Sequence, residues 1–216
     1  MATPEHPLLF LFRPAAGTGI RTLAVAAIPL LGLSAVLMLA GTAAMPDGYS
    51  WRFHSISESA AQGQQGGWIA RMSFMSFGAA VLAVSVSART SWPRLTYWMQ
   101  ASFAFFMFGA AAFSHAPWVP GASSDEVEDL LHSVCASGMG LAFCVGVVAR
   151  FVQRRLDGLA GRALDVFALI TATVLPLLLA SSSSVGGLVQ RIMFVVGYVW
   201  FGREALYILG VLRLAK

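Results

Sequence analysis

Six stretches of mainly apolar residues recur along the chain, and each is about as long as one membrane crossing. They cover residues 22–44, 68–88, 97–116, 131–152, 164–180 and 188–212. One helical crossing takes about 20 apolar residues, and the connections between the stretches are too short for a separate soluble domain. The pattern therefore predicts an all-α membrane protein: a single six-helix transmembrane domain over residues 22–212, preceded by a cytoplasmic N-terminal segment of residues 1–21.

Composition agrees with this class of protein. Of the 216 residues, 57% are hydrophobic and 11% are charged, whereas a soluble domain has about 25% charged residues. The net charge of +4 does not indicate a nucleic-acid partner, because the 14 basic residues are scattered along the chain. Neither the glycine-rich phosphate-binding motifs nor the G-x-S-x-G motif of hydrolases is found, so nothing supports a soluble enzyme.

Basic residues orient the predicted bundle, because Lys and Arg near the ends of spans are retained in the cytoplasm. Ten of them fall on one side of the six-span order: Arg13, Arg21, Arg89, Arg94, Arg150, Arg154, Arg155, Arg162, Arg213 and Lys216. Most of the acidic residues fall on the other side. We therefore expect both termini in the cytoplasm and a multi-pass protein of the bacterial inner membrane, with lipids around it.

The first connection, residues 45–67, is unusually polar for this chain and is expected on the outer side. His54 and Glu58 are four residues apart, so they share a face of any helix formed there, with Ser57 beside them. Ser55 and Glu58 also match the S-x-x-E capping box, in which both side chains satisfy free backbone N–H groups at a helix start. We expect a short interfacial helix that ends at Gly63.

The third connection, residues 117–130, is also expected outside and is preceded by His115. Glu128, His132 and Cys135 are spaced to face one way, and such a set of ligands is suited to zinc. A helix start is the favoured interpretation of Asp125, Glu126 and Asp129, whereas Glu128 fits either role. Ser123 or Ser124 would cap that helix, and the acids after them would favour the positive end of its dipole.

The outer candidates become a site only if the first and third connections meet. The residues concerned are His54, Ser57, Glu58, His115, Glu128 and His132. Together they would form either a hydrogen-bonded polar lid over the bundle or an acid–base and metal site for hydrolysis. No cofactor is expected for the lid. In the metal site, His54, His115 and His132 would be the zinc ligands.

Arg203 and Glu204 lie well inside the last apolar stretch, where charges are costly and usually face the protein interior. As sequence neighbours they point about 100° apart on a helix, so we do not expect them to pair with each other. Partners are expected on other helices, and the candidates are Ser73, Ser76, Thr171, Thr173 and the carbonyls near Pro29 and Pro176. A structural lock is favoured; an ion or proton pathway and an Arg203 that reaches to the inner surface are the alternatives.

Short motifs give the chain a resemblance to a known family. They are His-Ser-Ile-Ser-Glu at 54–58, Gly-Gly-Trp at 66–68, a short third connection with Pro and Gly, and Leu-Leu-His at 130–132. Over residues 23–212 the chain resembles the bacterial and archaeal membrane family called domain of unknown function 998. The family pattern falls on Ile56, Ser57, Glu58 and His132, and Ser59-Ala60 departs from its usual Leu-Gly. The resemblance implies a six-helix membrane fold and no established activity.

Three functions remain open at this point, and whether the protein is an enzyme is one of the open questions. The first is an accessory or lipid- or ligand-binding membrane subunit without catalysis, with a protein partner in a membrane complex as one form of it. The second is a membrane-embedded metal-dependent hydrolase that uses the outer His and Glu residues. The third is a small transporter that uses Arg203 and Glu204.

Overall fold

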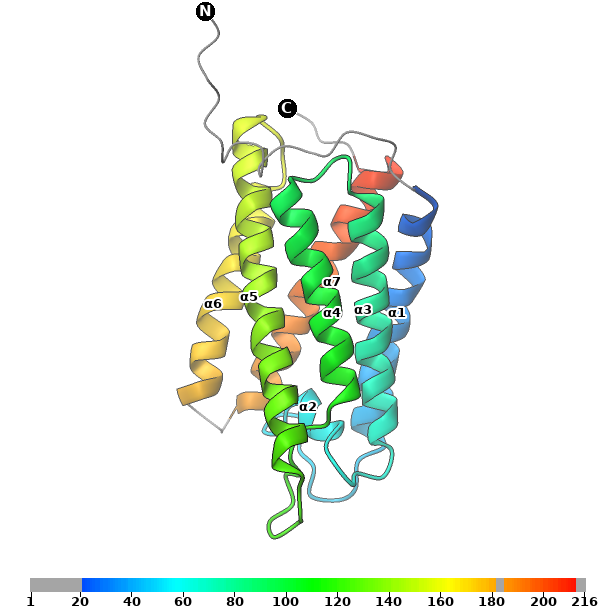
Figure 1. Ribbon diagram of the computed structural model, residues 1–216, viewed down its shortest axis with the longest axis vertical. Coiled ribbons are helices and arrows are strands. Elements are labelled where there is room, and N and C mark those ends of the chain that lie inside the picture. Colours follow the sequence, from blue (N-terminus) through cyan, green and yellow to red (C-terminus); the bar gives the residue numbers. More distant parts are fainter. Residues whose placement is uncertain (1–20, 182–184, 213–216) are drawn as a thin grey trace, which may run out of the picture.

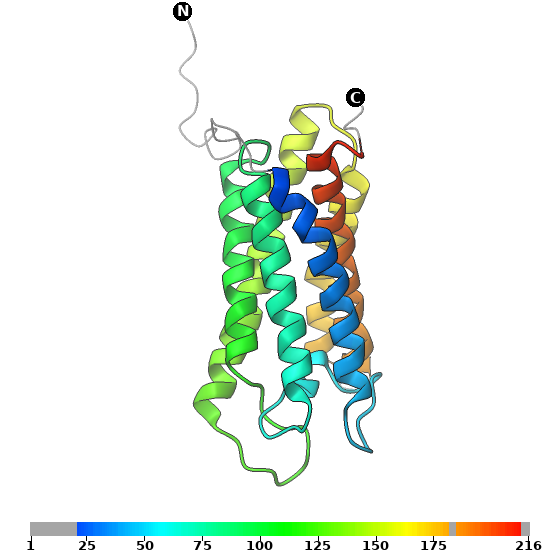
Figure 2. The ribbon, with the colours of Figure 1, turned by 90° about the vertical axis from the view of Figure 1, so that its right-hand side faces the viewer.

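The computed structural model describes residues 21–181 and 185–212. Over these ranges the chain forms the helices α1 (Arg21–Ala43), α2 (Ile56–Ser59), α3 (Gly67–Ser87), α4 (Arg94–Ala112), α5 (Glu126–Leu156), α6 (Arg162–Ser181) and α7 (Gly186–Leu209), and no strand. The six long helices run up and down beside one another, and the short α2 lies at one end (Figures 1 and 2). That end is called the α2 end below. Nearly all of the predicted segment 1–21, as well as Arg213 and Lys216, lies outside the described residues.

Four helices, α1, α3, α5 and α7, are long and apolar enough to cross a membrane. This confirms the prediction of an all-α chain with several membrane-spanning helices. α1 begins and α7 ends at the end opposite α2, and there the Arg21 side chain donates to the carbonyl of Ile208 at 3.1 Å. The described chain therefore starts and finishes at the same end of the bundle.

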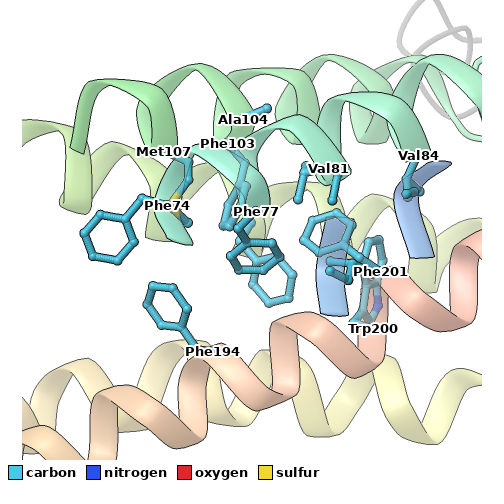
Figure 3. Packing of buried hydrophobic residues seen from close by; sticks show 14 of the residues in the cluster. Phe74, Phe77, Val81, Val84, Phe103, Ala104, Met107, Phe194, Trp200 and Phe201 are labelled. Carbon is cyan, nitrogen blue, oxygen red and sulfur yellow. The ribbon is translucent and has the colours of Figure 1, made fainter. Parts of the chain in front are cut away.

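The long helices form a ring in the order α1, α3, α4, α5, α6, α7, in which α7 returns to α1 and also contacts α3. Aromatic side chains fill the interior of this ring. Phe77 of α3 has its ring centroid 5.6 Å from that of Phe103 and 5.7 Å from that of Phe194, and Figure 3 shows these side chains pointing toward one another. The core thus lies between α3, α4, α5 and α7.

Small residues let α4 and α5 pack closely. A Cβ at Gly138 would collide with the ring of Phe106, and one at Gly146 would collide with the Gln100 amide. Both partners lie on α4. Close backbone approach through small residues is the usual basis of helix contact in membranes, where lipid is as apolar as the side chains.

α6 is the least embedded of the long helices, and Figure 1 shows it at one side of the bundle. Asp165, Ala168 and Thr171 are buried along one face of its first half. Beyond Ala172 no described residue of α6 is buried, and Val174 and Leu177 are 45% and 70% exposed. The second half of α6 therefore leaves the bundle and presents an apolar surface.

Several helix boundaries differ from those predicted, and two of the differences have a local cause. α5 begins at Glu126, five residues before the apolar stretch, because the Asp125 carboxylate accepts hydrogen bonds from the N–H groups of Val127 and Glu128. The N-cap is thus Asp125 and not Ser123 or Ser124. α4 ends at Ala112, four residues early, because Phe113 has an extended backbone.

Candidate functional site

α2 starts with the predicted capping box. The Ser55 hydroxyl accepts from the Glu58 N–H at 3.1 Å, and Glu58 Oε2 accepts from the Ser55 N–H at 2.5 Å. The helix ends at Ser59 rather than at Gly63, because the chain bends at Ala60, whose N–H turns back onto carbonyls of α2. The Glu58 carboxylate is therefore engaged in holding α2 together.

His54 lies apart from the other predicted histidines, against aromatic rings. Its Nδ1 accepts from the Ser50 N–H at 2.8 Å. Its ring lies 4.6 Å from that of Trp118 and 5.2 Å from that of Tyr49, centroid to centroid. Because Trp118 belongs to the third connection, this packing is one of the contacts that bring the first and third connections together.

His132 is buried at the start of α5, and both ring nitrogens have partners. Nδ1 lies 3.1 Å from the carbonyl oxygen of Ala110 and 2.9 Å from that of Phe113. Since both partners can only accept, Nδ1 carries the proton. Nε2, 3.0 Å from the Ser57 hydroxyl, then accepts from it. His132 thus ties α2 and the end of α4 to α5.

Three more side chains fasten the end of α4 to the start of α5. His115 stacks on His132 with ring centroids 5.4 Å apart, and its Nδ1 lies 2.5 Å from Asp129 Oδ1. The same carboxylate oxygen accepts from the Ala116 N–H at 2.7 Å, and Glu128 Oε1 accepts from the Ser114 N–H at 2.7 Å. The Asp129 carboxylate is therefore engaged by His115 and a backbone N–H, and the Glu128 carboxylate by a backbone N–H.

Gln62 is a bridging residue that the sequence did not single out. Its Oε1 accepts from the Asp125 N–H at 2.7 Å, while its Nε2 donates to the carbonyls of Asp125 at 2.9 Å and Ser114 at 3.2 Å. Its own N–H donates to the carbonyl of His115 at 2.9 Å. One amide side chain thus joins the first connection to the third, and a glutamine in a polar loop carries no pattern that reveals this.

The first and third connections therefore meet, and they bring Ser57, His115, Glu128, Asp129 and His132 together; these five residues are called the polar lid below. Glu58 borders the lid through its neighbour Ser57, and His54 stays with the aromatic rings. Among the described residues no three His, Cys, Asp or Glu side chains are arranged to hold a metal ion. The Cys135 thiol packs instead against Gly109 of α4. His54, His115 and His132 thus do not fit a shared zinc ion.

The intramembrane pair lies near the opposite end, and Arg203 faces the interior as expected. Its guanidinium donates to Asp165 Oδ1 at 2.5 Å, to the Gly161 carbonyl at 2.7 Å and to Glu204 Oε1 at 3.0 Å. The expectation that Arg203 and Glu204 do not pair is wrong, because the long arginine side chain bends back to its neighbour. Three of the hydroxyls proposed as partners are used elsewhere: Ser73 donates to the Ser34 carbonyl, and Thr171 and Thr173 donate to carbonyls of their own helix.

Glu204 is 1% exposed and receives donors from two other segments, the connection before α4 and helix α5. Trp92 Nε1, in the connection before α4, donates at 2.8 Å, Arg150 Nε donates at 3.1 Å, and Arg154 donates through Nη2. Arg150 and Arg154 lie toward the end opposite α2, as the six-span order predicts, but their side chains are buried inside the bundle. Sequence reasoning treated them only as indicators of orientation.

Asp165 of α6 is the acidic partner that sequence reasoning missed. It accepts from Trp200 Nε1 at 2.9 Å and pairs with Arg154 at 3.3 Å. A carboxylate at the start of an apolar stretch was the available signal, since such a residue usually requires a buried partner. Three guanidiniums, Arg150, Arg154 and Arg203, thus share two carboxylates, Asp165 and Glu204; these five residues are called the arginine cluster below.

An apolar cavity of about 60 Å³ lies between the polar lid and the arginine cluster. Its lining comes from five helices: Phe77, Phe103, Met107, Met139, Gly140, Phe143, Thr171, Ala172, Met193, Phe194 and Gly197. Met139, Gly140, Ala172 and Met193 are only half-buried, so the cavity reaches the surface between α5, α6 and α7. It lies where α6 begins to leave the bundle.

Comparison with known protein families gives a match. Residues 25–205 match the model of the family described as "Protein of unknown function (DUF998)". No curated protein and no solved structure matches the chain.

Proposed function

Because the chain belongs to the DUF998 family, whose function is unknown, we propose its function from its geometry: a non-catalytic membrane protein that binds a lipid acyl chain between α5, α6 and α7. The observation that carries the proposal is the apolar cavity open to the bundle surface at these three helices. The alternatives of a metal-dependent hydrolase and a transporter gain no comparable support from the contacts described above.

The proposal includes six membrane spans. α4 and α6 have 19 and 20 residues and lie alongside the other long helices. At 1.5 Å per residue they are each about 30 Å long, the thickness of a bilayer's hydrocarbon core. The end opposite α2 carries Arg21, Arg89 and Arg94, which favours placing it in the cytoplasm of a bacterial cell. The α2 end then faces outward.

The chemistry of the cavity selects an apolar occupant. Its lining offers one hydroxyl, that of Thr171, which donates to the carbonyl of Ala168 at 2.9 Å within α6. Cavities with apolar walls stay free of water and bind apolar groups. In a bilayer the abundant apolar group beside such an opening is a lipid acyl chain. Because the surrounding lipid is as apolar as this lining, the chain is held by close packing against the aromatic and methionine side chains rather than by transfer out of water.

The polar lid supports a structural role at the α2 end rather than catalysis. Its two histidines and two carboxylates each contact another part of the chain: His132 contacts Ser57, His115 contacts Asp129, and Glu128 contacts the Ser114 N–H. These contacts fix the ends of α4 and α5 and hold α2 in place. The walls of the cavity on those helices are thereby kept rigid.

Photolabelling tests the proposal. The purified protein is reconstituted in vesicles with palmitic acid that carries a diazirine in its chain, and labelled peptides are mapped by mass spectrometry. We expect labels on the segments around Met139–Phe143 and Met193–Gly197. Gly140 lines the cavity, and nothing lies within 4 Å of a Cβ placed there, so we expect Gly140→Leu to obstruct the cavity.

The matched control is Gly32→Leu, because Gly32 is also a helical glycine with open space around it, but on the exposed face of α1. Gly140→Leu is expected to reduce labelling of the cavity segments at least about fivefold, equivalent to roughly 1 kcal/mol. Gly32→Leu is expected to leave it unchanged. Equal labelling of every lipid-facing helix surface, insensitive to Gly140→Leu, would contradict lipid binding in the cavity.

A further inference from the structure

We infer that the lipid enters this cavity in one orientation, with its polar head at the α2 end beside Gln190 and the tip of its chain against Phe143. This inference rests on the proposed function and adds the leaflet and the direction. The ligand class is an amphiphile with a long acyl chain, taken from the leaflet that borders the α2 end. In the proposed topology that is the outer leaflet.

The cavity is closed toward the arginine cluster by aromatic rings. Phe143 of α5 packs edge-on against Trp200 of α7, with ring centroids 5.7 Å apart. Trp200 is fully buried, and its Nε1 is bonded to Asp165. Ala168, one turn after Asp165 on α6, is fully buried as well. α6 is thus held tightly against α7 at this end, and a chain cannot enter past it.

The described residues leave the cavity open in the other direction, along the second half of α6. Beyond Ala172 the described part of α6 has no buried residue. Met139 and Met193, which line this side, are half-buried and have flexible side chains that adapt to a ligand. A chain that enters between α5 and α6 therefore meets apolar surface until it reaches Phe143.

Polar groups follow on the same helix faces just outside the opening. Gln190 is one turn before Phe194 on the same face of α7, and His132 lies on the face of α5 that continues to Gly140. The half-buried Gln190 accepts from the Ile56 N–H at 2.6 Å, and His132 contacts Ser57 of the same short helix. Toward the α2 end the apolar lining of α5 and α7 thus gives way to polar side chains, and a polar head belongs at that end.

The depth of this path matches one leaflet. Gln190 and Trp200 are ten residues apart on α7, which is about 15 Å at 1.5 Å per residue. The hydrocarbon core of a bilayer is about 30 Å thick, so one leaflet contributes about 15 Å. A lipid with its head level with Gln190 therefore brings the end of its chain to the aromatic floor, without a head group crossing the apolar interior.

Two probes of different depth test the orientation on the wild-type protein. Phosphatidylethanolamine carries the diazirine either near the carboxyl carbon or at the chain terminus. We expect the shallow probe to label the segment around Gln190–Met193, and the terminal probe to label Phe143 and residues near Thr171. The same pair is made as free fatty acids, because an acyl chain can come from either source. The same depth order in either form supports the orientation, and the form that labels at lower concentration identifies the source.

The possible failures are distinct. If the terminal probe labels the segment at Gln190 and the shallow probe labels the floor, the orientation is overturned while lipid binding stands. If neither probe labels the cavity segments more strongly than the lipid-facing residues of α1, such as Val36 and Leu39, the proposed function fails as well. Gly140→Leu separates these cases further, because it should remove the label of the terminal probe at Phe143.

Discussion

Gly161 shows how a single residue supports the arginine cluster. Its backbone has a φ of +93°, its carbonyl accepts from Arg203, and an added Cβ would collide with the guanidinium of Arg154. Gly161→Ala should therefore combine backbone strain of about 1–2 kcal/mol with overpacking of about 1–3 kcal/mol. Thermal unfolding of the detergent-solubilised protein measures the loss.

The same loop provides the control for this substitution. Gly158 has a φ of +67°, but nothing lies within 4 Å of a Cβ placed there. Gly158→Ala should cost only the strain of about 1–2 kcal/mol. Equal melting temperatures for the two variants would show that the cluster does not need the space beside Arg154.

Arg203 is the residue of the cluster whose removal is most informative. Arg203→Leu leaves Asp165 without the donor that lies 2.5 Å from it, and loss of one partner from a buried ion pair costs about 3–5 kcal/mol. We expect a clear fall in thermal stability. Arg155→Leu is the control, because Arg155 is exposed on the same turn of α5 as the buried Arg154. Unchanged stability of Arg203→Leu would contradict the structural lock.

At the scale of elements, Gln62 holds two connections together that are far apart in sequence. Gln62→Ala removes three side-chain hydrogen bonds, two of them to Asp125. If the net loss is about 1 kcal/mol, local opening becomes roughly fivefold more frequent. Amide hydrogen exchange of the first turn of α5 should rise accordingly. Gln65→Ala, at an exposed neighbouring position, should leave exchange unchanged, and similar rates in both variants would contradict the bridging role.

The elements that sequence reasoning located were those with local signals. The capping box of Ser55 and Glu58 and the apolar runs are read within a few residues, and both match the structure. The start of α5 was misplaced because hydropathy detects only the apolar part of a helix, and Asp125 caps it earlier. The pairing of His132 with Ser57, 75 positions away, depends on how the helices are arranged. For this reason the sequence predicted a site only on the condition that the first and third connections meet.

At the scale of the whole molecule, the ring of helices is tied at both ends and loosened on one side. The polar lid joins α2, α4 and α5, whereas the arginine cluster joins α5, α6 and α7. Between the two, the second half of α6 diverges and the cavity opens. Sequence alone could not predict this arrangement, because Arg203, Asp165 and Arg154 lie on three helices whose relative rotation sets the contacts. It did predict that Arg203 faces inward, since an unpaired charge in lipid is costly.

The direction of the bundle in the membrane decides which leaflet borders the cavity opening. Gly158 lies in the connection from α5 to α6, next to Arg155 and Arg162, and Gly121 lies in the connection from α4 to α5, near Asp125. Basic connections are retained in the cytoplasm, so a reporter active only in the cytoplasm should work when fused after Gly158. A reporter active only outside should work after Gly121. If both fusions gave the opposite result, the α2 end would face the cytoplasm, and the lipid would then come from the inner leaflet.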